Sequence, residues 1–197
     1  MENIVKKITD NLIYNNLLSS NKRAVFEYKL QIKLLTYINY IIFLGLGLAT
    51  NHLIEIIVFL TAFLKLREST SGYHASSPVL CFIYSCIIVL SIYNLGNYIA
   101  LLNINFQIII ILITVLTILL FSPINHINLN LTKNEMNALK ESLYKKLIII
   151  FIIMLFLISI GFGYYNRYII LSLIFDAVFI LIAKFTGQEV NLKNENV

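Results

Sequence analysis

The chain has few of the residues that mark soluble, secreted or low-complexity proteins. Its 197 residues include no tryptophan, two prolines, two cysteines and seven glycines, and only 13% are charged. So little proline and glycine excludes a collagen-like or a flexible low-complexity chain. The cysteines, Cys81 and Cys86, form no CxxC pair, and the three scattered histidines give no zinc-binding spacing. We therefore expect no metal, no cofactor and no disulfide framework.

Apolar residues are what the chain has in excess. They make up 59% of the sequence, and the mean hydropathy is +0.83, whereas an ordinary soluble domain is roughly 45–50% apolar. A single globule of this length cannot hide so much apolar surface from water. The composition therefore predicts an integral membrane protein in contact with the lipid bilayer. The net charge of +5 comes without an RRM, zinc-finger or helix-turn-helix signature, so we expect no nucleic-acid partner.

The apolar residues gather into about six blocks, which predict an all-α, polytopic membrane helical bundle. The blocks are Leu34–Ala49, Leu53–Leu64, Val79–Tyr93, Ile99–Phe121, Leu147–Tyr164 and Tyr168–Phe185. The second and third blocks are short, so they either borrow flanking residues or enter only part of the bilayer. Apolar residues recur at helical spacing between Met1 and Leu18. We therefore predict that residues 1–33 are an amphipathic, membrane-surface helical region, or else a helix packed on the bundle. Residues 34–197 then form a transmembrane domain.

The basic residues fall on alternate connections between the blocks. All lysines and arginines except Arg167 lie before the first block, after the second, after the fourth or at the C-terminus. Because basic residues flank membrane segments on the cytoplasmic side, this pattern predicts that both termini and the loop after the second block are cytoplasmic.

That loop, residues 65–81, carries most of the reactive side chains. Ser77 and Pro78 are a typical N-cap and first residue of a helix, which predicts a helix starting at Pro78. Cys81 would then be its fourth residue, where the helix dipole favours the thiolate. On one straight helix His74 would lie about 10.5 Å away along the axis, but a break before Pro78 and the freedom of Gly72 allow the loop to fold back. A Cys–His pair of this kind is the minimum for nucleophilic catalysis.

The run Arg67…Gly72-x-His74-Ala75…Cys81, in a basic membrane protein of this length, resembles the accessory gene regulator protein B (AgrB) family. The resemblance covers nearly the whole chain. One departure is Ser71, where the family often has a first glycine. The step Ser122-Pro123 is also similar to a small-residue–proline step in the family.

The resemblance implies a bacterial cell-membrane cysteine endopeptidase of quorum sensing, with His74 and Cys81 as catalytic residues. Its substrate is a small AgrD-like precursor peptide, from which Cys81 releases the acidic C-terminal tail as a peptidyl thioester forms. A cysteine or serine of the precursor then closes a thiolactone or lactone ring. Arg67 binds the tail or, like Gly72, supports the loop. A homodimer is compatible with the resemblance.

Two other interpretations of the chain remain open from its sequence. It is either a non-enzymatic transporter or peptide exporter, or a related protease that hydrolyses the precursor without cyclising it. Asp176 and Glu55 are acids at membrane depth and therefore candidates for a functional role, including a third catalytic residue beside His74. Cys86 fits an inert, buried thiol better than a nucleophile.

Overall fold

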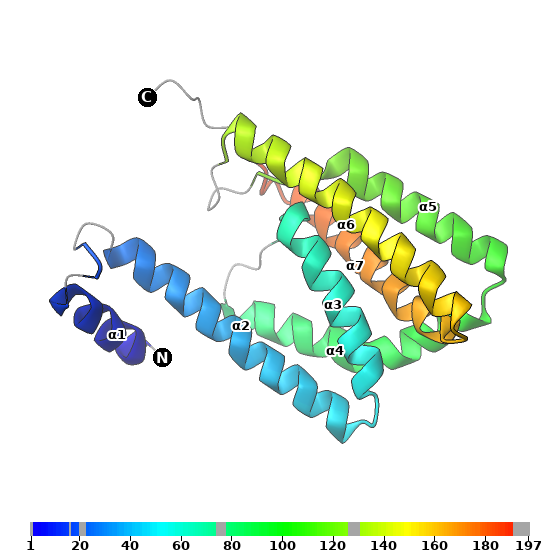
Figure 1. Cartoon of the computed structure of the whole chain (residues 1–197), viewed down its shortest axis with the longest axis horizontal. Coiled ribbons are helices and arrows are strands. Elements are labelled where there is room, and N and C mark those ends of the chain that lie inside the picture. Colours follow the sequence, from blue (N-terminus) through cyan, green and yellow to red (C-terminus); the bar gives the residue numbers. More distant parts are fainter. Residues whose placement is uncertain (1, 16, 20–22, 74–77, 126–130, 191–197) are drawn as a thin grey trace. The chain divides into compact units, whose positions relative to one another are not determined.

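A computed structural model describes residues 2–15, 17–19, 23–73, 78–125 and 131–190. Within these ranges the side chains of several helical residues, including that of Cys81, are not described. The described chain is helical along most of its length, which confirms the predicted all-α class. Its elements are α1 (Glu2–Tyr14), α2 (Arg23–Ala49), α3 (Leu53–Thr70), α4 (Pro78–Leu101), α5 (Ile104–Phe121), α6 (Lys133–Ser159), the 3-10 helix η2 (Gly163–Tyr165) and α7 (Asn166–Phe185) (Figure 1).

The chain divides into two units, Met1–Gly45 and Leu46–Val197. The first unit contains α1 and most of α2, and the Arg23 guanidinium joins them through an ion pair of 2.7 Å with Asp10. The amphipathic N-terminal segment is thus a helix, as predicted. Its place on the membrane surface, and the division of the chain at residue 34, stay predictions.

The second unit carries the helices that suit a membrane. Among the described residues, four helices are long and apolar enough to cross a bilayer: Phe82–Leu101, Ile104–Phe121, Lys133–Ser159 and Gly163–Phe185. The last of these, which contains α7, is the most buried, and α7 packs against α3, α4, α5 and α6 (Figure 1). The other three expose most of their apolar side chains. This arrangement confirms a polytopic membrane bundle with α7 at its centre.

The third and fourth apolar blocks divide at a different residue from the predicted one. Residues Ile99–Leu101 belong to α4, and α5 begins only after Asn103. The side-chain amide of Gln107 on α5 donates to the carbonyl oxygens of Ile99 at 3.2 Å and Leu102 at 2.9 Å. These hydrogen bonds give partners to carbonyl groups at the end of α4 that have none within the helix. The short third block therefore takes up flanking residues and becomes a helix of spanning length.

Glu135 follows Thr132 by three residues, which is the spacing of a capping box, and such a box starts α6. The Thr132 hydroxyl accepts a hydrogen bond from the Glu135 backbone N–H at 3.3 Å, and the Glu135 carboxylate accepts one from the Thr132 N–H at 2.8 Å. From there α6 continues without a break to Ser159. The polar segment that begins at Lys133 and the fifth apolar block are therefore one helix.

Candidate functional site

The structure describes the two ends of the predicted reactive loop. At one end, α4 begins at Pro78, so the backbone of Cys81 is the fourth residue of that helix, as predicted. At the other end the chain is described to Tyr73. His74 and Ser77 lie outside the described residues, as does the side chain of Cys81. What the structure does describe is the set of contacts that hold the two ends of the loop.

The predicted loop began at residue 65, but residues 65–70 belong to the end of α3. The helix ends at Ser71, which is left-handed with φ 52° and ψ 31°, and the Ser71 N–H donates to the Arg67 carbonyl oxygen at 3.1 Å. Glycine adopts this conformation without a steric penalty, whereas another L-residue loses roughly 1–2 kcal/mol. The position where the resemblance expects a glycine is therefore one that the backbone conformation itself favours for glycine.

We expect Ser71→Gly to stabilise the protein. Removing the Cβ relieves the left-handed strain at the end of α3, which corresponds to a gain of about 1 kcal/mol in the free energy of unfolding. Thermal unfolding in detergent micelles measures the change. Ser71→Ala, which keeps a Cβ in the same backbone conformation, is the matched control and should show no gain. An equal or lower melting temperature for Ser71→Gly would contradict this reading of the helix end.

Arg67 and Gly72 lie against the central helix α7. The Arg67 guanidinium donates to the carbonyl oxygen of Tyr73 and lies 5.0 Å from the centroid of the Phe179 ring. The backbone of Gly72 is not left-handed; it is buried, and a Cβ there would meet Arg67 Nη1 at 2.6 Å and the Phe179 carbonyl carbon at 3.3 Å. Gly72 thus permits a close approach rather than an unusual backbone rotation.

A second set of bonds ties the same segment to α7 and to the chain after α5. The Tyr73 N–H donates to the Phe179 carbonyl oxygen at 3.1 Å. The Thr70 hydroxyl donates to Asp176 Oδ1 at 2.9 Å, and both residues are fully buried. The Thr70 carbonyl oxygen accepts the Ile124 N–H at 3.0 Å. Hydrogen bonds to α7 and to the chain after α5 therefore hold the end of α3 in place. Thr70 makes two of these bonds, and the sequence analysis did not single it out.

Glu68 points to lysines of α3 and α6. Its carboxylate lies 3.1 Å from Lys146 Nζ and 3.3 Å from Lys65 Nζ. Partial burial by itself would raise the pKa of Glu68, but the hydrogen bonds and charges of the two lysines outweigh burial and hold that pKa below its ordinary value. Glu68 therefore links α3 to α6 through its ion pair with Lys146.

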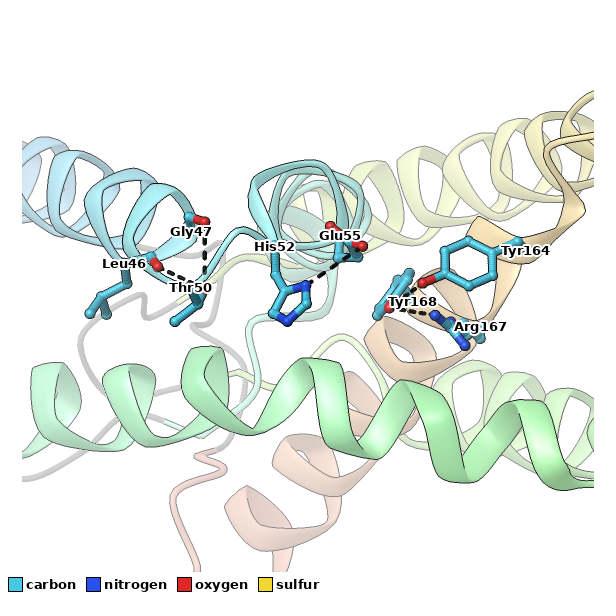
Figure 2. A network of polar contacts seen from close by, with 8 residues as sticks. All are labelled: Leu46, Gly47, Thr50, His52, Glu55, Tyr164, Arg167 and Tyr168. Atoms are coloured by element: carbon cyan, nitrogen blue, oxygen red, sulfur yellow. Dashed lines mark hydrogen bonds and ion pairs between the residues drawn. The ribbon is translucent and has the colours of Figure 1, made fainter.

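A separate polar cluster lies at the opposite end of α3 (Figure 2). His52 Nδ1 is 3.9 Å from the Glu55 carboxylate, and the His52 ring stacks on Tyr93 with centroids 3.6 Å apart. These residues line a cavity of about 360 Å³ between the α2–α3 connection and α4. Glu55 precedes Thr70 by fifteen residues, about 22 Å along a helix. Of the two acids at membrane depth, Asp176 is therefore the one beside the candidate loop.

The buried Arg167 lies near this cluster (Figure 2). Its guanidinium donates to the Tyr168 hydroxyl at 2.9 Å and lies 3.6 Å from the centroid of the Tyr164 ring. Arg167 is the one basic residue that does not fit the alternation of basic connections along the sequence. It packs among tyrosines at the start of α7.

Comparison with known proteins identifies one family. A model of accessory gene regulator B matches residues 2–183, nearly the whole chain, and the match includes the candidate loop and both of its described ends. No curated protein and no solved structure matches the chain.

Proposed function

Because the chain belongs to the accessory gene regulator B family, we propose that it is a membrane cysteine endopeptidase that matures a small precursor peptide. The family is associated with processing the precursor of the accessory gene regulator autoinducing peptide. The observation that carries the finer proposal is the place of Cys81 in the first turn of α4, directly after a loop whose other end is held on α7. The dipole of α4 favours the thiolate at that place.

The proposed reaction is an acyl transfer through Cys81. His74 takes the thiol proton, and the thiolate attacks the carbonyl carbon at the junction between the peptide and its acidic tail. The tetrahedral intermediate collapses with loss of the tail, whose new amine takes the proton from His74. A peptidyl thioester remains on Cys81. A cysteine or serine within the precursor then attacks the thioester, which frees the Cys81 thiol and closes the ring, provided that water is kept from the thioester.

We assign Arg67 and Gly72 to the support of this loop. The Arg67 guanidinium already donates to the Tyr73 carbonyl oxygen and stacks on Phe179, and Gly72 fits beneath it. These contacts fix the backbone immediately before His74. The alternative, in which Arg67 binds the acidic tail of the precursor, requires the guanidinium to leave Tyr73.

The proposal places the reaction at the cytoplasmic face of the bacterial membrane. The alternation of basic residues along the sequence favours cytoplasmic termini and a cytoplasmic loop, where a newly made precursor would meet Cys81. A homodimer stays a prediction.

The mass of the product tests whether the enzyme cyclises the peptide or only hydrolyses it. We expect the wild-type protein, reconstituted in liposomes with its precursor, to give a fragment lighter by one water molecule than the linear form. A precursor whose internal nucleophile is replaced by alanine should give no cyclic product. A linear fragment from the unmodified precursor would favour the hydrolase interpretation, and an uncut precursor would favour a non-enzymatic role. Mass spectrometry separates these outcomes.

A further inference from the structure

Glu55, near the start of α3, has no lysine or arginine partner in the described part of the chain. Its side chain is only 14% exposed, and the cationic group closest to its carboxylate there is His52 Nδ1 at 3.9 Å, too far for a hydrogen bond. Other described acids pair with lysine or arginine at 2.7–3.1 Å: Asp10, Glu27, Glu68, Glu141 and Glu189. A shielded carboxylate without a cation costs free energy, and in a membrane protein such an acid usually serves a function.

Arg167 does not supply the missing charge. Its guanidinium donates to the Tyr168 hydroxyl and lies over the Tyr164 ring, and within the described residues no ion pair joins it to Glu55. The Tyr168 ring is itself packed against α4, because a Cβ at Gly96 would meet it at 2.6 Å. The tyrosines therefore hold Arg167 away from the carboxylate of Glu55.

Glu55 lines a cavity in which a ligand can supply that charge. The cavity has a volume of about 360 Å³, within the range of ligand-binding pockets, and its polar lining consists of Thr50, His52, Glu55, Tyr93 and Asn94. The Thr50 hydroxyl already donates to the Leu46 carbonyl oxygen at 2.8 Å. The rest of the lining is apolar and includes Leu90, whose side chain is 53% exposed. The cavity therefore combines one negative charge with walls that suit apolar groups.

The aromatic rings of the lining favour one kind of cation. The His52 and Tyr93 rings stack with centroids 3.6 Å apart and planes inclined by 12°. Each ring has one face against the other, so this pair is not an open aromatic cage of the kind that binds quaternary ammonium groups. A carboxylate, by contrast, binds an ammonium group through its N–H donors. The lining therefore suits a primary ammonium group better than a fully methylated one.

The cavity lies near one end of the second unit. Glu55 is the third residue of α3, and Tyr93 is one helical turn from Gly96, against which Tyr168, the third residue of α7, is packed. The helix that contains α7 is long and apolar enough to cross a bilayer, so its first turn belongs at the edge of the hydrocarbon layer. Lipid head groups lie at this level, with their apolar chains directed toward the bilayer centre.

We propose that this cavity binds a primary ammonium group, with the Glu55 carboxylate as its acceptor. The position of the cavity favours an ammonium on a lipid head group, as in phosphatidylethanolamine, and a soluble amine carries the same chemistry. The inference is independent of the proposed reaction. The cavity lies at the opposite end of α3 from Thr70, about 22 Å away along the helix, and Glu55 takes no part in tail release.

Native mass spectrometry of the full chain in detergent tests the site with two lipids that have identical acyl chains. Phosphatidylethanolamine and phosphatidylcholine share the phosphate, but only the first has N–H donors on its ammonium. We expect the wild-type protein to bind phosphatidylethanolamine at least about ten-fold more tightly, which is the contribution of a hydrogen bond to a charged group. Glu55→Gln keeps the size of the side chain, removes the charge and should abolish the preference.

Glu135→Gln is the matched control for this variant. Glu135 is also the third residue of its helix, α6, but it is exposed and lies outside the lining of the cavity. Glutamine is accepted at this position of a capping box, so the variant should fold and keep the preference for phosphatidylethanolamine. Size-exclusion chromatography and thermal unfolding in detergent report the folding of both variants.

Ethanolamine and choline repeat the comparison without acyl chains and so identify the source of the ammonium. The protein is held in phosphatidylcholine nanodiscs, and the rise of its melting temperature with amine concentration measures binding. A preference for ethanolamine over choline supports a soluble amine, whereas a preference confined to the lipid pair supports the head group. Equal binding within both pairs overturns the proposal on the wild-type protein alone, even if Glu55→Gln does not fold. A preference that Glu55→Gln retains, or that Glu135→Gln also loses, overturns it as well.

Discussion

We expect that replacing Cys81 by serine abolishes release of the precursor's tail, while replacing Cys86 by serine leaves it intact. We expect a loss of at least about 10³-fold, which is typical when an enzyme loses its nucleophile. Serine keeps the size of the side chain, but its hydroxyl is a far weaker nucleophile than a thiolate favoured by a helix N-terminus. Co-expression with a precursor tagged on its tail, followed by immunoblotting, measures the cut.

Cys86 is the matched control for this experiment because it lies on the same helix, further from the N-terminus of α4. Among the residues whose side chains are described it is a free, half-buried cysteine. Its replacement therefore reports any general cost of losing a thiol from α4. A precursor that is still cut by the Cys81→Ser protein would remove Cys81 from the mechanism. Loss of cutting in both variants would point to damage of the helix rather than of the nucleophile.

We expect that replacing Gly72 by alanine lowers the rate of tail release by roughly 10²-fold, the cost of misplacing a catalytic group by about 1 Å. The new Cβ would lie 2.6 Å from Arg67 Nη1, closer than any normal contact, and the backbone of α7 blocks the other side at 3.3 Å. The guanidinium must shift, and we expect the shift to weaken the hydrogen bond that its other terminal nitrogen donates to the Tyr73 carbonyl oxygen. The residue before His74 then loses part of its support.

The change at Gly72 should act on kcat more than on stability. Gly45→Ala is the control, since a Cβ at Gly45 has no neighbour within 4 Å and alanine is the better helix former. Turnover in liposomes and melting temperature in detergent, measured on both variants, give the comparison. A Gly72→Ala protein with normal turnover would show that the contact with Arg67 does not matter for the loop.

Several local features of the fold were predictable because they depend on neighbours in the sequence. Pro78 lacks an N–H and has a fixed φ, which suits it to start a helix, and α4 does begin there. The spacing of Thr132 and Glu135 predicts a capping box, and the structure confirms it. The division between the third and fourth blocks was missed, because it depends on Gln107 reaching back to the end of α4.

The candidate site was predictable only in part. Arg67 and Gly72 stood out by their place in the motif, but their contact with each other and with Phe179 did not. The sequence suggested that Gly72 gives the loop freedom, whereas the structure shows that it makes room for Arg67. Asp176 was noticeable as an acid in an apolar block, but Thr70 carried no signal of its own.

The sequence by itself determined the membrane class, the helical fold and the start of α4 at Pro78. These follow from composition, from periodicity and from residue types at short spacing, which one chain displays without a partner segment. Only the tertiary structure decided what holds the loop, because that support comes from α7. Thr70 and Asp176 are 106 residues apart in the sequence and bonded in the fold, and no local pattern encodes a contact that exists only after both helices are buried together.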